Sequence, residues 1–333
     1  MAADQLPEHL GAWLSEQERR TVDVRGLTLA SAGARRVNAL FDATADGTTR
    51  RLALTMIPTA AIQLLDVAGE AAVRTLAEGA GVPVPHVHHV CTDASVLGGP
   101  FFISTAVDGE TVPRRVLRLV HAAGVGDRVV AQLGDAMARL HSIDPEAAPA
   151  VLPRPVGDGP VSTALLVVEQ QLDLLLDVSP TFAFGLRWLQ RNAPAEPDRQ
   201  TIVHTDIRTG NIIVGEDGLR AILDWETARV GDPMEDLAWP CQRMWRFRED
   251  ARTVGGLGPV DALRSAYVAA GGRWDDGRFE WWRVLGTVRW GLGLAGQARG
   301  HLDGSFPSIV MAASGRRVPE LEYDTLLLLR PTR

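Results

Sequence analysis

The feature that most constrains this chain is a short segment, residues 202–226, which reads IVHTDIRTGNIIVGEDGLRAILDWE. Two apolar runs, NIIVG and LRAILDW, flank an Asp-Gly pair, and such a pair between apolar runs is a strong hairpin signal. Four polar side chains interrupt the segment, namely His204, Asp206, Asn211 and Asp224. A hairpin brings its two ends together, so Asn211 at the start of the first strand and Asp224 at the end of the second should lie close together.

These polar residues have the chemistry of a metal-assisted reaction. A carboxylate and an amide oxygen on adjacent strands make a hard oxygen site that suits Mg²⁺ and its phosphate ligands, so we predict Asn211 and Asp224 as metal ligands. Asp206, in the loop after a buried strand, is placed to accept the proton of an attacking hydroxyl. A metal clamp and a positioned base are what phosphoryl transfer requires. The alternative is that these residues only cap strands and turns.

Composition excludes several functions. The net charge of −7 leaves no basic surplus to neutralise a nucleic acid, and none of the 34 basic residues is Lys. Two cysteines are too few for a disulfide framework or a thiolate zinc site and fit a reducing compartment. The N-terminus lacks a secretory pattern, and no apolar run approaches the ~20 residues of a membrane helix. We expect a cytoplasmic protein whose partner is a small molecule, not a nucleic acid or a membrane, with its oligomeric state open.

The order of the expected elements predicts an α+β fold with two lobes. Residues 22–58 read as strands joined by small-residue turns, and a helix follows over about 59–78. The run PFFISTAV, residues 100–107, reads as a buried strand, after which the pattern is mainly helical apart from the hairpin. We therefore expect a small β-rich lobe over 1–107 and a larger, mainly helical lobe over 108–333, with a ligand site in the cleft between them.

The motifs HTDIRTGN, ILDWE and GDPMEDLAW resemble those of the aminoglycoside phosphotransferase and choline kinase superfamily, a branch of the protein-kinase-like fold. The likeness is strongest to the branch resembling the kinase-like N-terminal domain of certain acyl-CoA dehydrogenases. The first motif contains His204, Asp206, Arg208 and Asn211, with Thr205 where that branch usually has Gly. The resemblance implies a two-lobed kinase-like fold, ATP and Mg²⁺ as cofactors, and Asp206 and Arg208 as catalytic residues. It also implies that the first lobe binds the nucleotide and that the second is catalytic and binds the acceptor.

Two stretches of the first lobe resemble the nucleotide-binding parts of the family more loosely. SAGARRVN occupies the place of the phosphate-covering loop, which implies nucleotide contacts by Ser31, Gly33 and Arg35. VLGGPFFISTAVDGE resembles the strand that leads into the hinge. The adenine edge would there bond to backbone groups near Thr105 and Val107.

One position departs from the family pattern. The family's phosphate-binding cation stands on the strand after the covering loop, where this chain has Leu52, Ala53, Leu54 and Thr55. Ala53 and Thr55 share one face because side chains alternate along a strand, so Thr55 stands where the cation should be. Glu70 matches the helix glutamate that normally pairs with that cation, and it lacks this partner unless an Arg reaches it from another direction. The candidates are Arg35, Arg36, Arg50 and Arg51.

Two functions are open. The first is an ATP- and Mg²⁺-dependent phosphotransferase that moves the γ-phosphate to a hydroxyl of a small molecule, either a metabolite such as a hydroxyacyl compound or an antibiotic such as an aminoglycoside. The second is a non-catalytic nucleotide- or ligand-binding pseudokinase that lost its strand cation. The complete set Asp206, Asn211 and Asp224 favours the enzyme, whereas Thr55 favours the pseudokinase. We predict the enzyme.

The C-terminal third is rich in Trp. Aromatic residues at helical spacing are typical of a core, although aromatic rings also bind apolar acceptors well. We expect most of them to be core residues. They include Trp239, Trp245, Trp281, Trp282 and Trp290.

Overall fold

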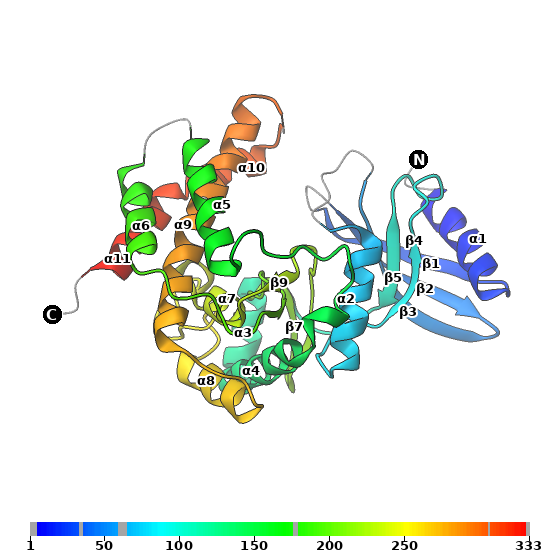
Figure 1. Cartoon of the computed structure of the whole chain (residues 1–333). Helices are drawn as coiled ribbons and strands as arrows, with labels where there is room; N and C mark the ends of the chain where they lie inside the picture. The colour runs from blue at the N-terminus through cyan, green and yellow to red at the C-terminus, as the bar shows by residue number, and fades with distance from the viewer. Residues whose placement is uncertain (1–4, 33–35, 59–64, 176–178, 306, 331–333) are drawn as a thin grey trace.

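A computed structural model describes residues 5–32, 36–58, 65–175, 179–305 and 307–330. A β-rich lobe and a mainly helical lobe lie side by side, with the N-terminus in the first and the C-terminus in the second (Figure 1). This is the two-lobed kinase-like fold that the sequence predicted. The last strand of the first lobe ends at Thr105 and the next helix begins at Pro113. A domain boundary at residue 107 stays a prediction.

The first lobe is a five-stranded antiparallel sheet with strand order β1-β2-β3-β5-β4. Its apolar face packs under helix α1, and helix α2 lies on the side of the helical lobe (Figure 1). The elements are α1 (Leu6–Glu18), β1 (Asp23–Ala32), β2 (Val37–Ala45), β3 (Thr48–Met56), α2 (Val67–Gly79), β4 (Val87–Cys91) and β5 (Phe101–Thr105).

Helix α2 begins later than the sequence predicted. The side chain of Asp66 accepts a hydrogen bond from the backbone N–H of Gly69 at 2.6 Å, so Asp66 caps the helix and Val67 is its first residue. The expected helix over 59–78 is therefore wrong at residues 65 and 66, and its first six residues lie outside the described ranges. The cap fixes the start of the helix that carries Glu70.

The second lobe is built around the long helix α9. The short strands β6 to β9 lie on the side where this lobe meets the first lobe (Figure 1). Within the described ranges, no helix is long and apolar enough to cross a membrane. The helices are α3 (Pro113–Ala123), α4 (Gly126–Ser142), α5 (Pro160–Asp173), α6 (Pro180–Arg191), α7 (Pro233–Ala238), α8 (Val260–Ala269), α9 (Asp276–Leu302), α10 (Ile309–Gly315) and α11 (Val318–Leu329). The strands are β6 (Thr201–Val203), β7 (Ile212–Gly215), β8 (Gly218–Ile222) and β9 (Arg229–Gly231).

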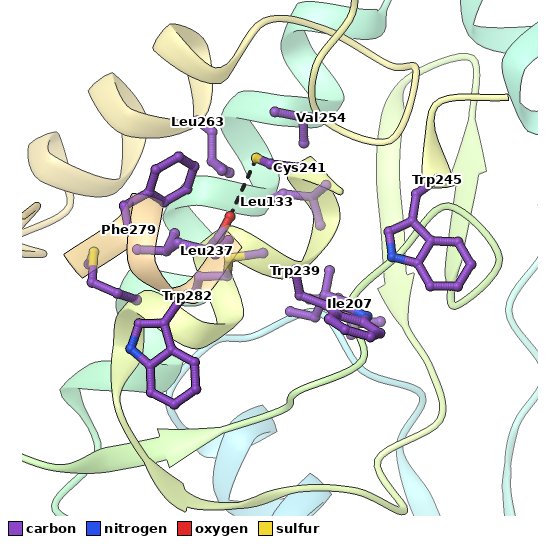
Figure 2. Close-up of a cluster of buried hydrophobic side chains, with 14 of the residues drawn as sticks. Leu133, Ile207, Leu237, Trp239, Cys241, Trp245, Val254, Leu263, Phe279 and Trp282 are labelled. Carbon is purple, nitrogen blue, oxygen red and sulfur yellow. Dashed lines mark hydrogen bonds between the residues drawn. The ribbon is translucent and has the colours of Figure 1, made fainter. Parts of the chain in front are cut away.

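The core of this lobe forms where α4, α7, α8 and α9 meet. Leu133, Leu237 and Leu263 are buried there, and Trp282 of α9 belongs to the same cluster (Figure 2). The thiol of Cys241 donates to the carbonyl of Leu237, and burial raises the pKa of Cys241 to about 12. This cysteine is therefore an apolar core residue and not a reactive thiol. The prediction that the tryptophans are core residues holds for Trp282.

Candidate active site

The predicted hairpin is present and brings its two ends together. β7 and β8 pair antiparallel with Ile212 opposite Ile222, and the N–H of Leu223 donates to the carbonyl of Asn211 at 2.8 Å. Asp224 lies two residues beyond β8 rather than at its last position. Its φ of 64° is in the left-handed region, which turns the chain sharply after the strand.

Asp206 is held by three donors. Trp239 Nε1 donates to Oδ1 at 2.9 Å, Asn211 Nδ2 donates to Oδ2 at 2.7 Å, and Arg208 Nε lies 3.3 Å from Oδ1. The side chain remains 22% exposed, so one part of the carboxylate is open to a reactant. This fixed, partly open carboxylate has the geometry that a general base needs.

Asp236 anchors the loop that carries Asp206. The carboxylate of Asp236 is fully buried and accepts hydrogen bonds from the backbone N–H groups of His204 and Thr205 and from His141 Nε2. Thr205, which replaces the family's Gly, has a φ of 70°, and its hydroxyl donates to the carbonyl of Thr227 at 3.0 Å. A β-branched residue is strained in this conformation, so the loop needs these anchors.

Acid should weaken this anchor. Burial alone would raise the pKa of Asp236, but its hydrogen bonds and its charge interactions with His141 and His204 outweigh burial and lower that pKa. A carboxyl group with a folded-state pKa below its unfolded value stabilises the fold above the unfolded pKa, about 3.9. That stabilisation is lost as the pH falls from about 4 through the folded-state pKa.

We therefore expect Asp236→Asn to lower the free energy of unfolding by about 3 kcal/mol at pH 7, since it breaks a buried charged network. As the pH falls from about 5 to below about 4, the variant should also lose less stability than the wild type, because it has no carboxylate at position 236 to protonate. Urea unfolding across that range measures both effects. Asp198→Asn, at an exposed site, is the control. Wild-type stability in Asp236→Asn would contradict the anchoring role.

Arg36 is the cation that Glu70 contacts. Its Nη2 lies 2.8 Å from Glu70 Oε2 and 2.9 Å from Glu226 Oε2, and its Nη1 lies 3.5 Å from Asp224 Oδ1. The side chains of Arg36 and Glu70 are 10% and 1% exposed, so the pair is shielded from water. Burial alone would lower the pKa of Arg36, but the three carboxylates outweigh burial and raise it. The guanidinium therefore joins the α2 glutamate to the predicted metal ligand.

The sheet register explains how Arg36 reaches this place. Asn38 pairs with Thr55 across β2 and β3, and the Thr55 hydroxyl donates to Asn38 Oδ1 at 3.0 Å. Arg36 precedes Asn38 by two residues, and residues two apart in an extended chain point to the same side. The cation thus enters from the start of β2, beside the position on β3 where Thr55 stands.

Other candidate cations point elsewhere. Arg50 pairs with Glu18, and Arg51 pairs with Asp42 at 3.0 Å. Among the candidates that the structure describes, Arg36 is thus the one that contacts Glu70. It is one of the four substitutes that the sequence left open. Gly33 and Arg35 lie outside the described residues, and Ser31 is described only as part of the β1 backbone.

The predicted hinge is partly engaged in strand pairing. The N–H of Thr105 donates to the carbonyl of His86 at 2.9 Å, and the N–H of Ala106 donates to the carbonyl of Arg51 at 3.1 Å. Ala53 lies opposite Ser104, so its small side chain stands next to the hinge strand. The backbone N–H of Thr105 is therefore not free for an adenine ring, and among these positions Val107 is the better candidate.

The donor set fits Mg²⁺. The amide nitrogen of Asn211 donates to both the backbone oxygen and the carboxylate of Asp206, which leaves Asn211 Oδ1 as the atom available to a metal. Asp224 offers a carboxylate that is 34% exposed, and Glu226 stands two residues further on. Hard oxygen ligands with room for water and phosphate are what Mg²⁺ prefers. Glu226, in the ILDWE motif, is the alternative metal position that the sequence offers, and in the structure it contacts Arg36.

A wall of indole rings stands beside Asp206. The ring centroids of Trp239, Trp245 and Trp290 lie 5.4–5.8 Å apart, and Figure 2 shows Trp239 next to Ile207 in the loop that carries Asp206. The guanidinium of Arg208 lies 5.1 Å from the Trp245 ring centroid. These tryptophans are buried or half-buried, as predicted, but Trp239 also holds the candidate base, which the core interpretation did not foresee.

Comparison with known proteins agrees with this geometry. Residues 28–282 match a family model described as "Phosphotransferase enzyme family". The chain is 25% identical over 263 residues to acyl-CoA dehydrogenase family member 10 of Mus musculus, covering 74% of this chain and 24% of that protein. The chain therefore spans about a quarter of the length of this curated relative.

Solved structures give the same fold. A structure described as a putative aminoglycoside phosphotransferase from Ralstonia eutropha superposes with a TM-score of 0.72 at 22% identity, covering 96% of this chain and 97% of that one. The GDP complex of aminoglycoside 2'-phosphotransferase-IIIa superposes with a TM-score of 0.65 at 14% identity, covering 96% and 99%. At these identities the likeness is one of fold.

Proposed function

Because the chain belongs to the phosphotransferase enzyme family, we propose that it transfers the γ-phosphate of ATP, with Mg²⁺, to a hydroxyl group of a small molecule. The observation that carries the proposal is the Asp206 carboxylate, which is fixed by Trp239 and Asn211 yet partly open. A GDP complex of a protein with this fold supports a nucleotide as the donor. The acceptor class is a metabolite or an antibiotic.

Each residue has a task in this reaction. Asp206 orients the acceptor hydroxyl and takes its proton as the oxygen attacks phosphorus. Asn211 and Asp224 would hold Mg²⁺, which neutralises charge on the phosphate oxygens when it is bound. Arg36, paired with Glu70, supplies the positive charge toward the phosphates that a strand cation gives in relatives. Arg208 stacks over Trp245 and steadies Asp206.

The pseudokinase alternative rested on Thr55. Its main argument was that the nucleotide site has no cation, and the Arg36–Glu70 ion pair supplies one from β2. A positive charge beside the phosphates has the same effect whichever strand it comes from, because its field depends on its position in space and not in the sequence. The enzyme is therefore the function we propose. A screen of ATP consumption against hydroxylated metabolites and antibiotics, with Asp206→Ala as the blank, tests it.

Asp224→Ala should abolish the dependence of ATP affinity on Mg²⁺. The variant leaves the predicted metal site with the Asn211 amide and with Glu226, which Arg36 already engages. Calorimetric titration of ATP with and without Mg²⁺ measures the effect, and Asp217→Ala at the exposed hairpin turn is the matched control. An unchanged effect of Mg²⁺ in Asp224→Ala would move the metal site to Glu226, which the double variant Asp224→Ala/Glu226→Ala would reveal.

A further inference from the structure

A large cavity lies among α5, α6, α9, α10 and α11. Figure 1 shows these helices at the end of the helical lobe away from the sheet. Its volume is about 1020 Å³, which is the size of pockets that enclose small molecules. Most of its lining is apolar, and two leucines at its mouth, Leu174 and Leu302, are 64% and 74% exposed. The apolar side chains of the lining include Leu174, Leu175, Phe182, Leu292, Met311 and Val318.

One wall of the cavity continues the face of α9 that looks onto Asp206. Trp290 contacts Trp239, whose Nε1 donates to Asp206, so this face of α9 borders the candidate base. Positions three or four apart lie on one face of a helix, and such positions after Trp290 are Gly293, Gln297 and Gly300. All three residues line the cavity, as does Gly296 on the adjoining side of the helix. A ligand held at Asp206 that extends past the indole rings would follow this face of α9 toward the cavity.

The packing of the described chain does not explain two of these glycines. Glycine destabilises the middle of a helix, so a helical glycine usually reflects a close neighbour. Gly286 and Gly291 have such neighbours, with Gln242 and Phe182 each within 2.5 Å of the position a Cβ would take. No described neighbour comes within 4 Å of that position at Gly293 or Gly296, so these residues leave open space along the wall.

We propose that this cavity holds the apolar body of the phosphate acceptor, an amphipathic alcohol whose hydroxyl reaches Asp206. The inference rests on the proposed function and specifies its substrate class. Gly293 and Gly300 are separated by seven residues, or about 10 Å of helix, so the cavity takes an alkyl chain or ring system of that length. A polycationic acceptor has no apolar body and would leave Leu174 and Leu302 exposed to water.

Two glucosides that share the same ring hydroxyls test the proposal, octyl β-glucoside below its micelle concentration and methyl β-glucoside. Calorimetry on the full chain with ADP and Mg²⁺ should show the octyl compound binding at least about tenfold more tightly, because its chain leaves water. Gly293→Leu and Gly296→Leu should each remove that difference by filling the wall. Leu forms helix more readily than Gly, so both variants should fold.

Gly277→Leu is the matched control, since Gly277 is an exposed glycine of α9 outside the cavity, and it should keep the difference. Equal binding of the two glucosides by the wild type would overturn the proposal. So would an octyl preference that survives Gly293→Leu, or a dimer in sedimentation that Gly293→Leu dissociates, because a second copy would then cover the cavity. Binding is measured without transfer, so a chain that prefers the octyl compound but phosphorylates no acceptor loses the proposed function alone.

Discussion

Asp206→Asn should lower the rate of phosphate transfer about 10²- to 10⁴-fold, because the amide cannot take the proton of the acceptor hydroxyl. The Kd for ATP should change by less than about twofold, since Asp206 faces the acceptor and the amide keeps the shape of the side chain. Asn also retains an oxygen that can accept from Trp239 or Asn211, so the loop should stay folded. Single-turnover kinetics, with the enzyme in excess over the acceptor and ATP saturating, measures the transfer rate. Calorimetry of ATP binding measures the Kd separately.

Asp217→Asn is the control for the loss of one carboxylate from the same hairpin. Its side chain is exposed at the turn and pairs with Arg220, away from Asp206. This variant should transfer phosphate at the wild-type rate. If Asp206→Asn also keeps the wild-type rate in a single turnover, Asp206 is not the base and the proposed roles in this loop are wrong.

Arg36→Ala should weaken ATP binding by at least about tenfold, which corresponds to the loss of one charge-assisted interaction of roughly 1.4 kcal/mol or more. The same change at Arg50 or Arg51 should have little effect, because those guanidinium groups pair with Glu18 and Asp42. Calorimetric titration of ATP measures all three variants. Removal of Arg36 also leaves Glu70 buried without a cation, so thermal unfolding must first establish that the variant is folded.

A rescue experiment distinguishes a charge for ATP from a merely structural ion pair. In the Arg36→Ala background, Thr55→Lys places a cation on β3 at the position where the family pattern has one, and it should restore a large part of the ATP affinity. In the wild-type background the same substitution should add little, since Arg36 already occupies Glu70. Wild-type ATP affinity in Arg36→Ala would instead show that Arg36 only holds α2 in place, and the pseudokinase interpretation would regain its main support.

The parts of the site that could be predicted from sequence are those held by local geometry. The Asp-Gly turn fixes the β7–β8 hairpin, and the hairpin alone brings Asn211 and Asp224 together. The Gly-Asp-Pro motif is also a local one, because Asp232 caps α7 and Pro233 is the first residue of the helix. Such short-range features, a turn or a helix cap, can be recognised in the sequence.

The parts that could not be predicted depend on contacts between distant segments. Four arginines near the covering loop were equally good partners for Glu70, and only the register of β2 against β3 decides which of them points at α2. The same is true of Trp239, which is separated from Asp206 by 33 residues and whose indole N–H could not be assigned a partner from helical spacing. A sequence pattern gives the face of an element, but the tertiary structure decides what that face meets.

The central claim is that this chain moves the γ-phosphoryl group of ATP to an alcohol with Asp206 as the base. The most direct measurement uses ATP labelled with ¹⁸O in its γ-phosphate, the full chain, Mg²⁺ and the acceptors that the ATP-consumption screen selects, with the product analysed by mass spectrometry. We expect the wild type to form a labelled phosphate monoester of an acceptor, and Asp206→Asn to form none. Release of labelled inorganic phosphate alone, or equal product from both proteins, would contradict it.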